Sequence, residues 1–178
     1  GLGDVYKRQV LHQAEPGDYD DKYIRWRPQD LPIVPTEWKL LITDSSRQQF
    51  ETVKELIGKA DIIVNAGDPD REGQLLVDEV LYFVGNTKPV QRILLNALDE
   101  KSVKSALGDL RDNKDFHNLY QSALARARAD WLIGMNLSRA YTLSERYKGH
   151  KVTLPIGRVK TPTLALVVRR ERELAAFK

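Results

Sequence analysis

The chain has 178 residues, of which 42% are hydrophobic and 30% charged, which is enough for one medium domain or two small ones with a packed core. It contains no cysteine, so disulfide bonds and thiolate metal sites are excluded, and no apolar run approaches the roughly 20 residues that span a bilayer. The net charge of +3 divides unevenly: residues 1–100 hold 12 Lys and Arg against 18 Asp and Glu, and residues 101–178 hold 16 against 7.

The first residues differ in character from the rest. Residues 1–9 read GLGDVYKRQ and resemble a translated adapter sequence, so we expect them to be non-native and the chain proper to begin at residue 10, inside a domain. Residues 14–35 are rich in Pro, Asp, Tyr and Trp without a sustained period. This composition predicts a long ordered loop.

Between residues 38 and 95, short apolar runs alternate with segments of helical period. Ser45 or Ser46 is a candidate cap for the first helix, whose expected apolar face carries Phe50, Val53, Leu56 and Ile57. Alternation of strand and helix predicts an α/β sheet with parallel neighbours. The predicted elements are strands over 38–42, 61–66 and 92–95, and helices over 46–57 and 71–84.

After Asp99 the pattern becomes helical throughout. The predicted helices cover residues 100–111, 115–145 and 161–177, and Pro155, Gly157 and Pro162 separate the second from the third. The fold class expected from the whole pattern is therefore α/β, followed by an all-α segment.

Three carboxylates crowd the end of the predicted strand over 61–66. Asp68, Asp70 and Glu72 lie in the string GDPDREGQ, at the carboxyl end of that strand, where open α/β sheets bind their ligands. Such carboxylates repel one another, and a hard divalent cation such as Mg²⁺ neutralises them. The plain alternative is a solvated turn before an acidic helix start, because acidic residues suit helix N-termini.

The residues around these acids add to the pattern. Gly67 and Gly73 permit tight turning and close backbone approach. Arg71, set between the acids, is placed either to pair with them or to reach a phosphate.

The full string DPDREG resembles the acidic motif of the Toprim domain in type IA topoisomerases. The longer string DPDREGQLLVDEVL, residues 68–81, is similar to bacterial topoisomerase III, with Gln74 where many relatives carry a further acid. The resemblance implies a Rossmann-like Toprim sheet in which Asp68, Asp70 and Glu72 are metal and active-site carboxylates. It also implies Mg²⁺ as the cofactor and Arg71 as a member of the active site.

The basic half carries arginines on its predicted helices. Arg126 and Arg128 diverge on the helix, Asp130 lies within pairing distance of Arg126, and Arg158 and Lys160 flank the next helix start. Ordinary solvated helix faces are the alternative. The strings SALARARADWLIGMN and GRVKTPTLALVVRRERE resemble the helical domain that follows Toprim in topoisomerase III, although family members usually read GRVQTP, so Lys160 replaces a glutamine. The resemblance implies contacts with single-stranded DNA by Arg126, Arg128, Arg139, Arg158, Lys160 and Thr161.

The resemblance covers essentially residues 10–178. It implies a partial Toprim domain over 10–99 and part of the helical DNA-binding domain over 100–178. The chain is expected to be a fragment of an ATP-independent enzyme that cleaves, passes and rejoins single strands. We expect neither the first Toprim strand nor the nucleophilic tyrosine in this chain, because none of the tyrosines has the family's context: Tyr19, Tyr23, Tyr82, Tyr120, Tyr141 and Tyr147.

Further expectations concern partners and place. We expect a monomeric parent protein in the bacterial cytoplasm, associated with the nucleoid and with no membrane as partner. We also expect no nucleoside triphosphate as partner, because no phosphate-binding G-x-x-x-x-G-K-[ST] loop is present. Two other interpretations stay open. One is a non-catalytic nucleic-acid-binding module, and the other is a different Toprim enzyme, such as a primase or nuclease.

Overall fold

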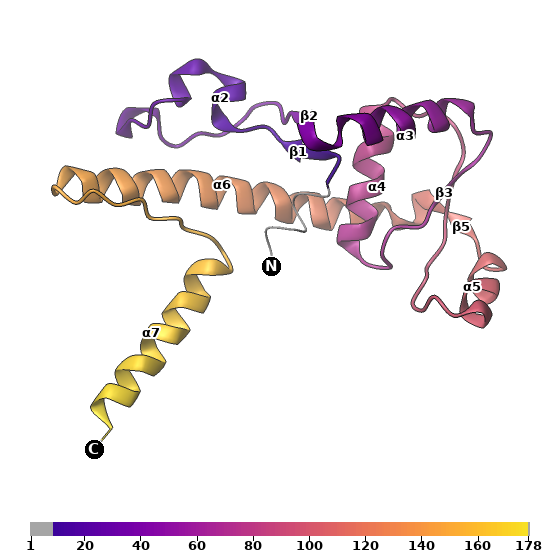
Figure 1. Ribbon diagram of the computed structural model, residues 1–178. Coiled ribbons are helices and arrows are strands. Elements are labelled where there is room, and N and C mark those ends of the chain that lie inside the picture. Colours follow the sequence, from indigo (N-terminus) through magenta and orange to yellow (C-terminus); the bar gives the residue numbers. More distant parts are fainter. Residues whose placement is uncertain (1–8, 178) are drawn as a thin grey trace. The chain divides into compact units, whose positions relative to one another are not determined.

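The computed structural model describes residues 9–177 (Figure 1) and divides into two compact units. Of the described residues, the first unit contains 9–14 and 38–125, and the second contains 15–37 and 126–177. The prediction about residues 1–9 falls, apart from Gln9, outside the described residues. The first unit is mixed α/β with two small sheets, and the described part of the second consists of helices and turns, as expected for an α/β fold followed by an all-α segment. The division lies inside a helix, and the domain assignment 10–99 and 100–178 stays a prediction.

The strands of the first unit form two small sheets rather than one. In the first sheet two strands pair antiparallel, with Leu11 opposite Ile42. In the second, the middle strand has one parallel and one antiparallel neighbour. The expectation of a single sheet with parallel neighbours is therefore only partly right. The first sheet is β1 (Leu11–Gln13) with β2 (Leu40–Ile42), and the second is β3 (Ile63–Asn65), β4 (Val90–Arg92) and β5 (Arg111–Asp112).

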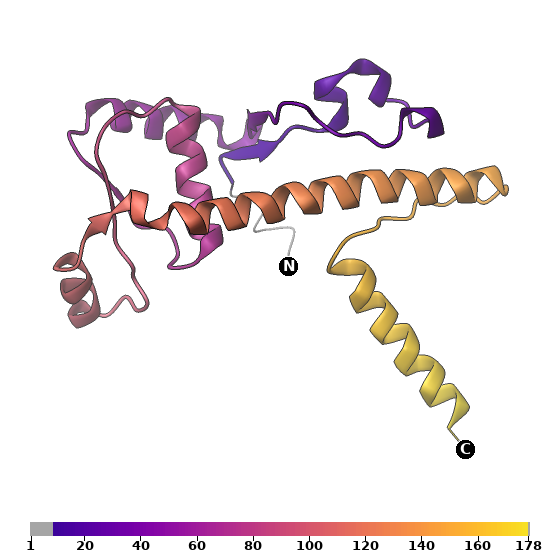
Figure 2. The same ribbon diagram turned by 180° about the vertical axis from the view of Figure 1, so that it is seen from behind.

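Helix α3 (Arg47–Lys59) and helix α4 (Arg71–Phe83) enclose the core of the first unit. Leu11, Phe50 and Val80 form a buried cluster in it, and the Phe50 and Phe83 rings meet edge to face with centroids 5.5 Å apart. Figures 1 and 2 show the start of α3 against the end of α4. Leu56, expected on the apolar face of α3, is 60% exposed. At 100° per residue it lies roughly 90° from the centre of the stripe that Phe50, Val53 and Ile57 form.

Two boundaries in the first unit differ from expectation. The strand predicted over 92–95 is β4, which ends at Arg92 because it pairs with β3 over three residues only. The helix predicted over 100–111 is α5 (Glu100–Leu107); it ends at Leu107, with Gly108 as its C-cap, and the chain then forms β5 against β4. A 3₁₀ turn, Asn113–Phe116, leads into α6 (His117–Tyr147).

In the second unit, residues 15–37 fold against the part of α6 that begins at Arg126. The predicted loop contains short turns, α2 (Pro16–Tyr19), η1 (Asp21–Tyr23) and η2 (Pro28–Asp30). Asn136 holds it by accepting from the backbone N–H of Ile33 at 2.6 Å and donating to the Ile33 carbonyl at 2.9 Å. Helix α7 (Lys160–Ala176) completes the unit. None of the helices within residues 9–177 is long and apolar enough to cross a membrane.

Candidate functional site

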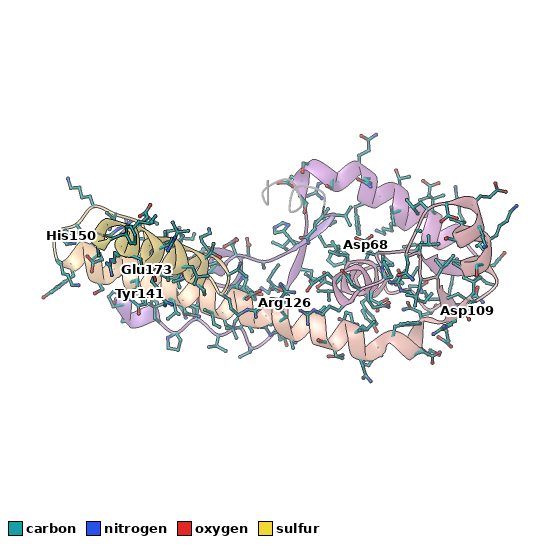
Figure 3. All side chains as sticks on the ribbon, turned by 90° about the horizontal axis from the view of Figure 1, so that it is seen from below. Asp68, Asp109, Arg126, Tyr141, His150 and Glu173 are labelled. Carbon is teal, nitrogen blue, oxygen red and sulfur yellow. The ribbon has the colours of Figure 1, made fainter. Side chains whose placement is uncertain are left out.

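The acidic segment, defined as residues 67–74, runs from the end of β3 into the first turn of α4 (Figure 3). Asp68 and Asp70 are exposed and Glu72 is half-buried. Asp70 is the N-cap of α4, and one of its carboxylate oxygens accepts from the backbone N–H of Gly73 at 2.7 Å. Arg71 Nε lies 3.5 Å from Glu72 Oε1, so the arginine pairs with its neighbouring acid.

Both glycines of the segment are needed because backbone lies against backbone there. A Cβ atom on Gly73 would stand 2.3 Å from the carbonyl oxygen of Asp68 and 2.5 Å from its nitrogen. A Cβ atom on Gly67 would stand 2.6 Å from the carbonyl oxygen of Gly73. Real contacts of this kind are essentially never that short, so the segment folds back on the first turn of α4 only with glycine at both positions.

The carboxylates share the segment without converging on one point. In the part of the chain that the structure describes, no group of three or more His, Cys, Asp or Glu side chains is placed to hold a metal ion. The donor chemistry nevertheless suits a hard cation, since exposed carboxylate oxygens are the ligands that Mg²⁺ takes together with waters. The metal role of Asp68, Asp70 and Glu72 stays a prediction.

A buried arginine, expected from the sequence only as the first residue of a strand, contacts the backbone of the acidic segment. Arg92, at the end of β4, is 1% exposed. Its Nη1 donates to the carbonyls of Asn65 at 3.1 Å and Gly67 at 2.7 Å, and its Nη2 donates to that of Asp68 at 2.6 Å. Burial lowers the pKa of Arg92, and the negative charges of Asp78 first, then of Asp70 and Asp68, oppose that effect. The one feature of the sequence that could have indicated this buried arginine is its position at the start of the apolar run RILL.

A buried polar network ties α4 to the turn before α6. Gln74 Nε2 donates to Asp78 Oδ2 at 2.9 Å and to Asn113 Oδ1 at 2.8 Å. Asn113 Nδ2 donates to Asp78 Oδ1 at 2.8 Å, and Asn65 Nδ2 donates to Asn113 Oδ1 at 3.1 Å. Gln74, fully buried, therefore points into the unit rather than toward the exposed carboxylates.

In the second unit, two of the predicted DNA-binding arginines share one carboxylate. Arg158 makes a two-pronged pair with Asp130, with Nη2 to Oδ2 at 3.2 Å, and Arg126 Nε lies 4.0 Å from Asp130 Oδ2 (Figure 3 labels Arg126 on α6). The hydrogen bond from Arg158 is the main reason that the pKa of Asp130 lies below its ordinary value. The pairing of Arg126 with Asp130 confirms the expected spacing.

Arg158 reaches Asp130 because the segment after α6 runs back along that helix (Figures 1 and 2). The backbone N–H of Leu154 donates to Thr142 Oγ1 at 2.9 Å, and that of Ile156 donates to Ser138 Oγ at 2.8 Å. Hydroxyl groups on one face of α6 therefore fix the returning backbone. The side chain of Arg158 remains 45% exposed.

The other predicted DNA-binding residues have different surroundings. Arg139 is 6% exposed; it donates to the Tyr23 carbonyl at 2.7 Å, and its guanidinium lies 5.2 Å from the centre of the Trp26 ring. It holds residues 15–37 in place rather than facing solvent. Thr161 Oγ1 accepts from the Gly157 N–H at 3.0 Å. Arg128 is half-buried, and Lys160 is exposed at the start of α7.

Comparison with known proteins decides what this arrangement is related to. A family model described as DNA topoisomerase matches residues 114–178. The chain is 50% identical over 172 residues to DNA topoisomerase 3 of Vibrio cholerae, covering 94% of this chain and 27% of that protein. The chain is homologous to part of bacterial DNA topoisomerase 3. The topoisomerase 3 of Salmonella typhimurium is 49% identical and that of Bacillus licheniformis 39%, with 94% and 93% of this chain covered and 26% and 22% of the relatives.

The fold agrees with this relationship to topoisomerase 3. The full-length topoisomerase I of Thermotoga maritima matches with a TM-score of 0.57 and 25% identity, covering 80% of this chain and 23% of that one. The chain spans about a quarter of the length of the curated relatives it matches. The relationship favours the topoisomerase interpretation over the primase, the nuclease and the non-catalytic module.

Proposed function

We propose that this chain is part of a type IA DNA topoisomerase of the topoisomerase III kind, an enzyme that cleaves, passes and rejoins single DNA strands with Mg²⁺ and without a nucleoside triphosphate. The observation that carries the proposal is the acidic segment, folded tightly between β3 and α4 in a chain homologous to DNA topoisomerase 3. The Toprim assignment of residues 10–99 and a bacterial cytoplasmic location belong to the same proposal.

The three carboxylates of the acidic segment are the proposed Mg²⁺ ligands: Asp68, Asp70 and Glu72. When bound there, the ion supplies positive charge that neutralises the acids and polarises a phosphate oxygen. One carboxylate oxygen of Asp70 caps the N-terminus of α4, and its other oxygen is the proposed ligand of the cation. Arg71, beside Glu72, is placed to bind a phosphate that displaces its carboxylate partner.

The test of this function is the effect of Mg²⁺ on binding of a labelled single-stranded oligonucleotide, followed by fluorescence anisotropy. We expect Mg²⁺ to change the affinity of the wild-type chain at constant ionic strength. The double substitution Asp68→Asn and Asp70→Asn should remove that change while leaving DNA binding by the second unit intact. Affinity that does not depend on Mg²⁺ in either protein would instead favour a nucleic-acid-binding module without a metal site.

Single-stranded DNA is the proposed partner of the second unit. Arg126 and Arg158 both lie beside Asp130 with their side chains partly exposed, so a phosphate that displaces this one carboxylate can contact both arginines. Contacts of this kind are to phosphates and carry no sequence preference. The proposed contact residues are Arg126, Arg128, Arg158, Lys160 and Thr161; the buried Arg139, which holds residues 15–37, is not among them.

Replacing both Arg126 and Arg158 by alanine should weaken binding of single-stranded DNA and lower its salt dependence. Loss of two phosphate contacts removes about 1.4 from the slope of log affinity against log salt, at roughly 0.7 per contact. Anisotropy titrations over a series of salt concentrations measure both quantities. The substitution Asp130→Asn should act in the opposite direction, because it releases both arginines from their competing carboxylate.

The matched control for this pair is Arg47→Ala with Lys59→Ala, which removes the same charge from exposed positions of α3 in the first unit. We expect the control to retain most of the wild-type slope. Equal slopes for the two double variants would mean that overall charge, rather than these arginines, determines DNA binding.

The chain by itself should form no covalent adduct with DNA, even with Mg²⁺. Positioning a phosphate breaks no bond without a nucleophile. Tyr82 packs against Tyr120 at the end of α4 opposite to the acidic segment, roughly 15 Å along the helix. Incubation with radiolabelled single-stranded DNA followed by denaturing electrophoresis detects any covalent adduct between protein and DNA. A labelled protein band that disappears when one of the described tyrosines becomes phenylalanine would contradict the prediction.

A further inference from the structure

We propose that Arg92 is a positioning residue for the acidic segment: its buried guanidinium fixes the backbone from which Asp68 and Asp70 project, and thereby sets the affinity of the segment for a divalent cation. The first half of the proposal rests on contacts in the first unit. The second half rests on the proposed function.

The contacts of Arg92 are concentrated on the turn that carries the acids. One side chain from β4 binds the carbonyl of Asn65 at the end of β3 and the carbonyls of Gly67 and Asp68 in the connection to α4. It also donates to Asn65 Oδ1 at 3.2 Å and to the carbonyl of Ile93 at 3.1 Å. The same Asn65 Oδ1 accepts from the backbone N–H of Gly67 at 3.0 Å. These hydrogen bonds fix the backbone of the turn from its buried side, and the carboxylates of Asp68 and Asp70 stay exposed.

The partners of the guanidinium explain why it acts on position rather than by pairing with the acids. These hydrogen bonds go to neutral carbonyl and amide oxygens rather than to the carboxylates of Asp68 and Asp70, and the charge of the buried Asp78 offsets part of the cost of burying the guanidinium. Its positive charge behind the segment offsets part of the repulsion between the exposed carboxylates. A turn ordered before the metal arrives loses less conformational freedom on binding, and this favours tighter binding.

Lysine cannot reproduce this arrangement. The guanidinium is a planar fork whose two terminal nitrogens point to different carbonyls, whereas lysine has one ammonium nitrogen. The substitution Arg92→Lys keeps the charge and most of the length, but an ammonium cannot reach the Gly67 and Asp68 carbonyls and the Asn65 group together. This variant therefore separates geometry from charge.

The experiment compares Arg92→Lys with Val80→Ala in the full chain. Val80 is a buried core residue of α4 and makes none of the Arg92 contacts, so its truncation destabilises the same unit by another route. Hydrogen exchange of peptides covering residues 65–74 reports the order of the segment. Mn²⁺ titration followed by electron paramagnetic resonance reports the affinity. Melting temperatures show how far each variant is destabilised.

We expect Arg92→Lys to speed exchange within residues 65–74 well beyond the change in the rest of the unit. It should also weaken Mn²⁺ binding by about 10-fold or more, the usual effect of losing a residue that orients metal ligands. Val80→Ala should leave both quantities near wild type after correction for its melting temperature. Changes that follow melting temperature in the same way for both variants would overturn the proposal.

The outcomes also separate this inference from the proposed function. If wild type binds Mn²⁺ through Asp68 and Asp70 but Arg92→Lys alters neither exchange nor affinity, the metal site stands and the role of Arg92 is refuted. If wild type binds no Mn²⁺, the metal site and the affinity half of the proposal both fail. Selective loosening of residues 65–74 in Arg92→Lys would then support the positioning half alone.

Discussion

Replacing Gly73 by alanine should destabilise the first unit by about 3 kcal/mol, the upper range for forcing extra atoms into a packed site. The added Cβ would meet backbone atoms of Asp68 at 2.3 and 2.5 Å, and backbone cannot move aside as the end of a flexible side chain does. The turn must open, and the Arg92 bonds to the Gly67 and Asp68 carbonyls should lengthen or break. Hydrogen exchange of α3 and α4 peptides across a urea series measures the stability of this unit alone.

The control for this substitution is Gly58→Ala in α3. A Cβ atom at Gly58 has no neighbour within 4 Å, and alanine favours helix over glycine by up to about 1 kcal/mol. The two glycine-to-alanine changes should therefore have opposite signs. A Gly73→Ala variant as stable as wild type, with unchanged exchange in residues 65–74, would show that the close approach of Asp68 to α4 does not persist in solution.

Replacing Gln74 by glutamate should cost the first unit about 3 kcal/mol or more at neutral pH, the scale for an uncompensated buried charge. Gln74 Nε2 donates to Asp78 Oδ2 and Asn113 Oδ1, and a carboxylate oxygen in its place would turn both bonds into contacts between acceptors. Asp78 is 4% exposed, so water does not screen the two charges. The same urea series, read from peptides of α4, measures the loss.

The effect of this change on stability should depend on pH in a defined direction. Burial beside Asp78 should raise the pKa of the introduced carboxyl above about 4.3, the ordinary value of glutamate. A group whose folded pKa is raised stabilises the protein below its unfolded pKa and loses that contribution as pH rises through the folded pKa. The difference from wild type should therefore be smallest below about pH 4 and largest at neutral pH.

Gln74→Met is the matched control, because it keeps the approximate volume and loses the two hydrogen bonds without adding charge. It should be less destabilising than Gln74→Glu, and its difference from wild type should vary little with pH. If both variants lose the same stability at every pH, the lost hydrogen bonds explain the whole effect and the charge argument is wrong.

Local conformation around the acidic segment follows from the sequence alone. The helix predicted over 71–84 is α4, residues 71–83, and the strand before it is β3. Asp70 is a capping residue type, the two glycines allow a tight turn, and the apolar period begins at once after them. Each of these signals acts between residues a few positions apart, which is why no knowledge of distant partners was needed. The long helix and the last helix, predicted over 115–145 and 161–177, were found by the same kind of signal.

Only the tertiary structure decided which side chains are buried and what they bind. Arg92 and Asn65 are 27 positions apart, Gln74 and Asn113 are 39, and Arg139 and Tyr23 are 116. No local pattern tells a buried arginine from an exposed one, because its charge is tolerated inside only when distant carbonyls or a ring are brought to it. Arg92 was therefore missed, and Arg139 was grouped with the exposed arginines. The pairing of β1 with β2 in a separate sheet has the same cause: strand partners are chosen by the packing of the whole unit rather than by the strand itself.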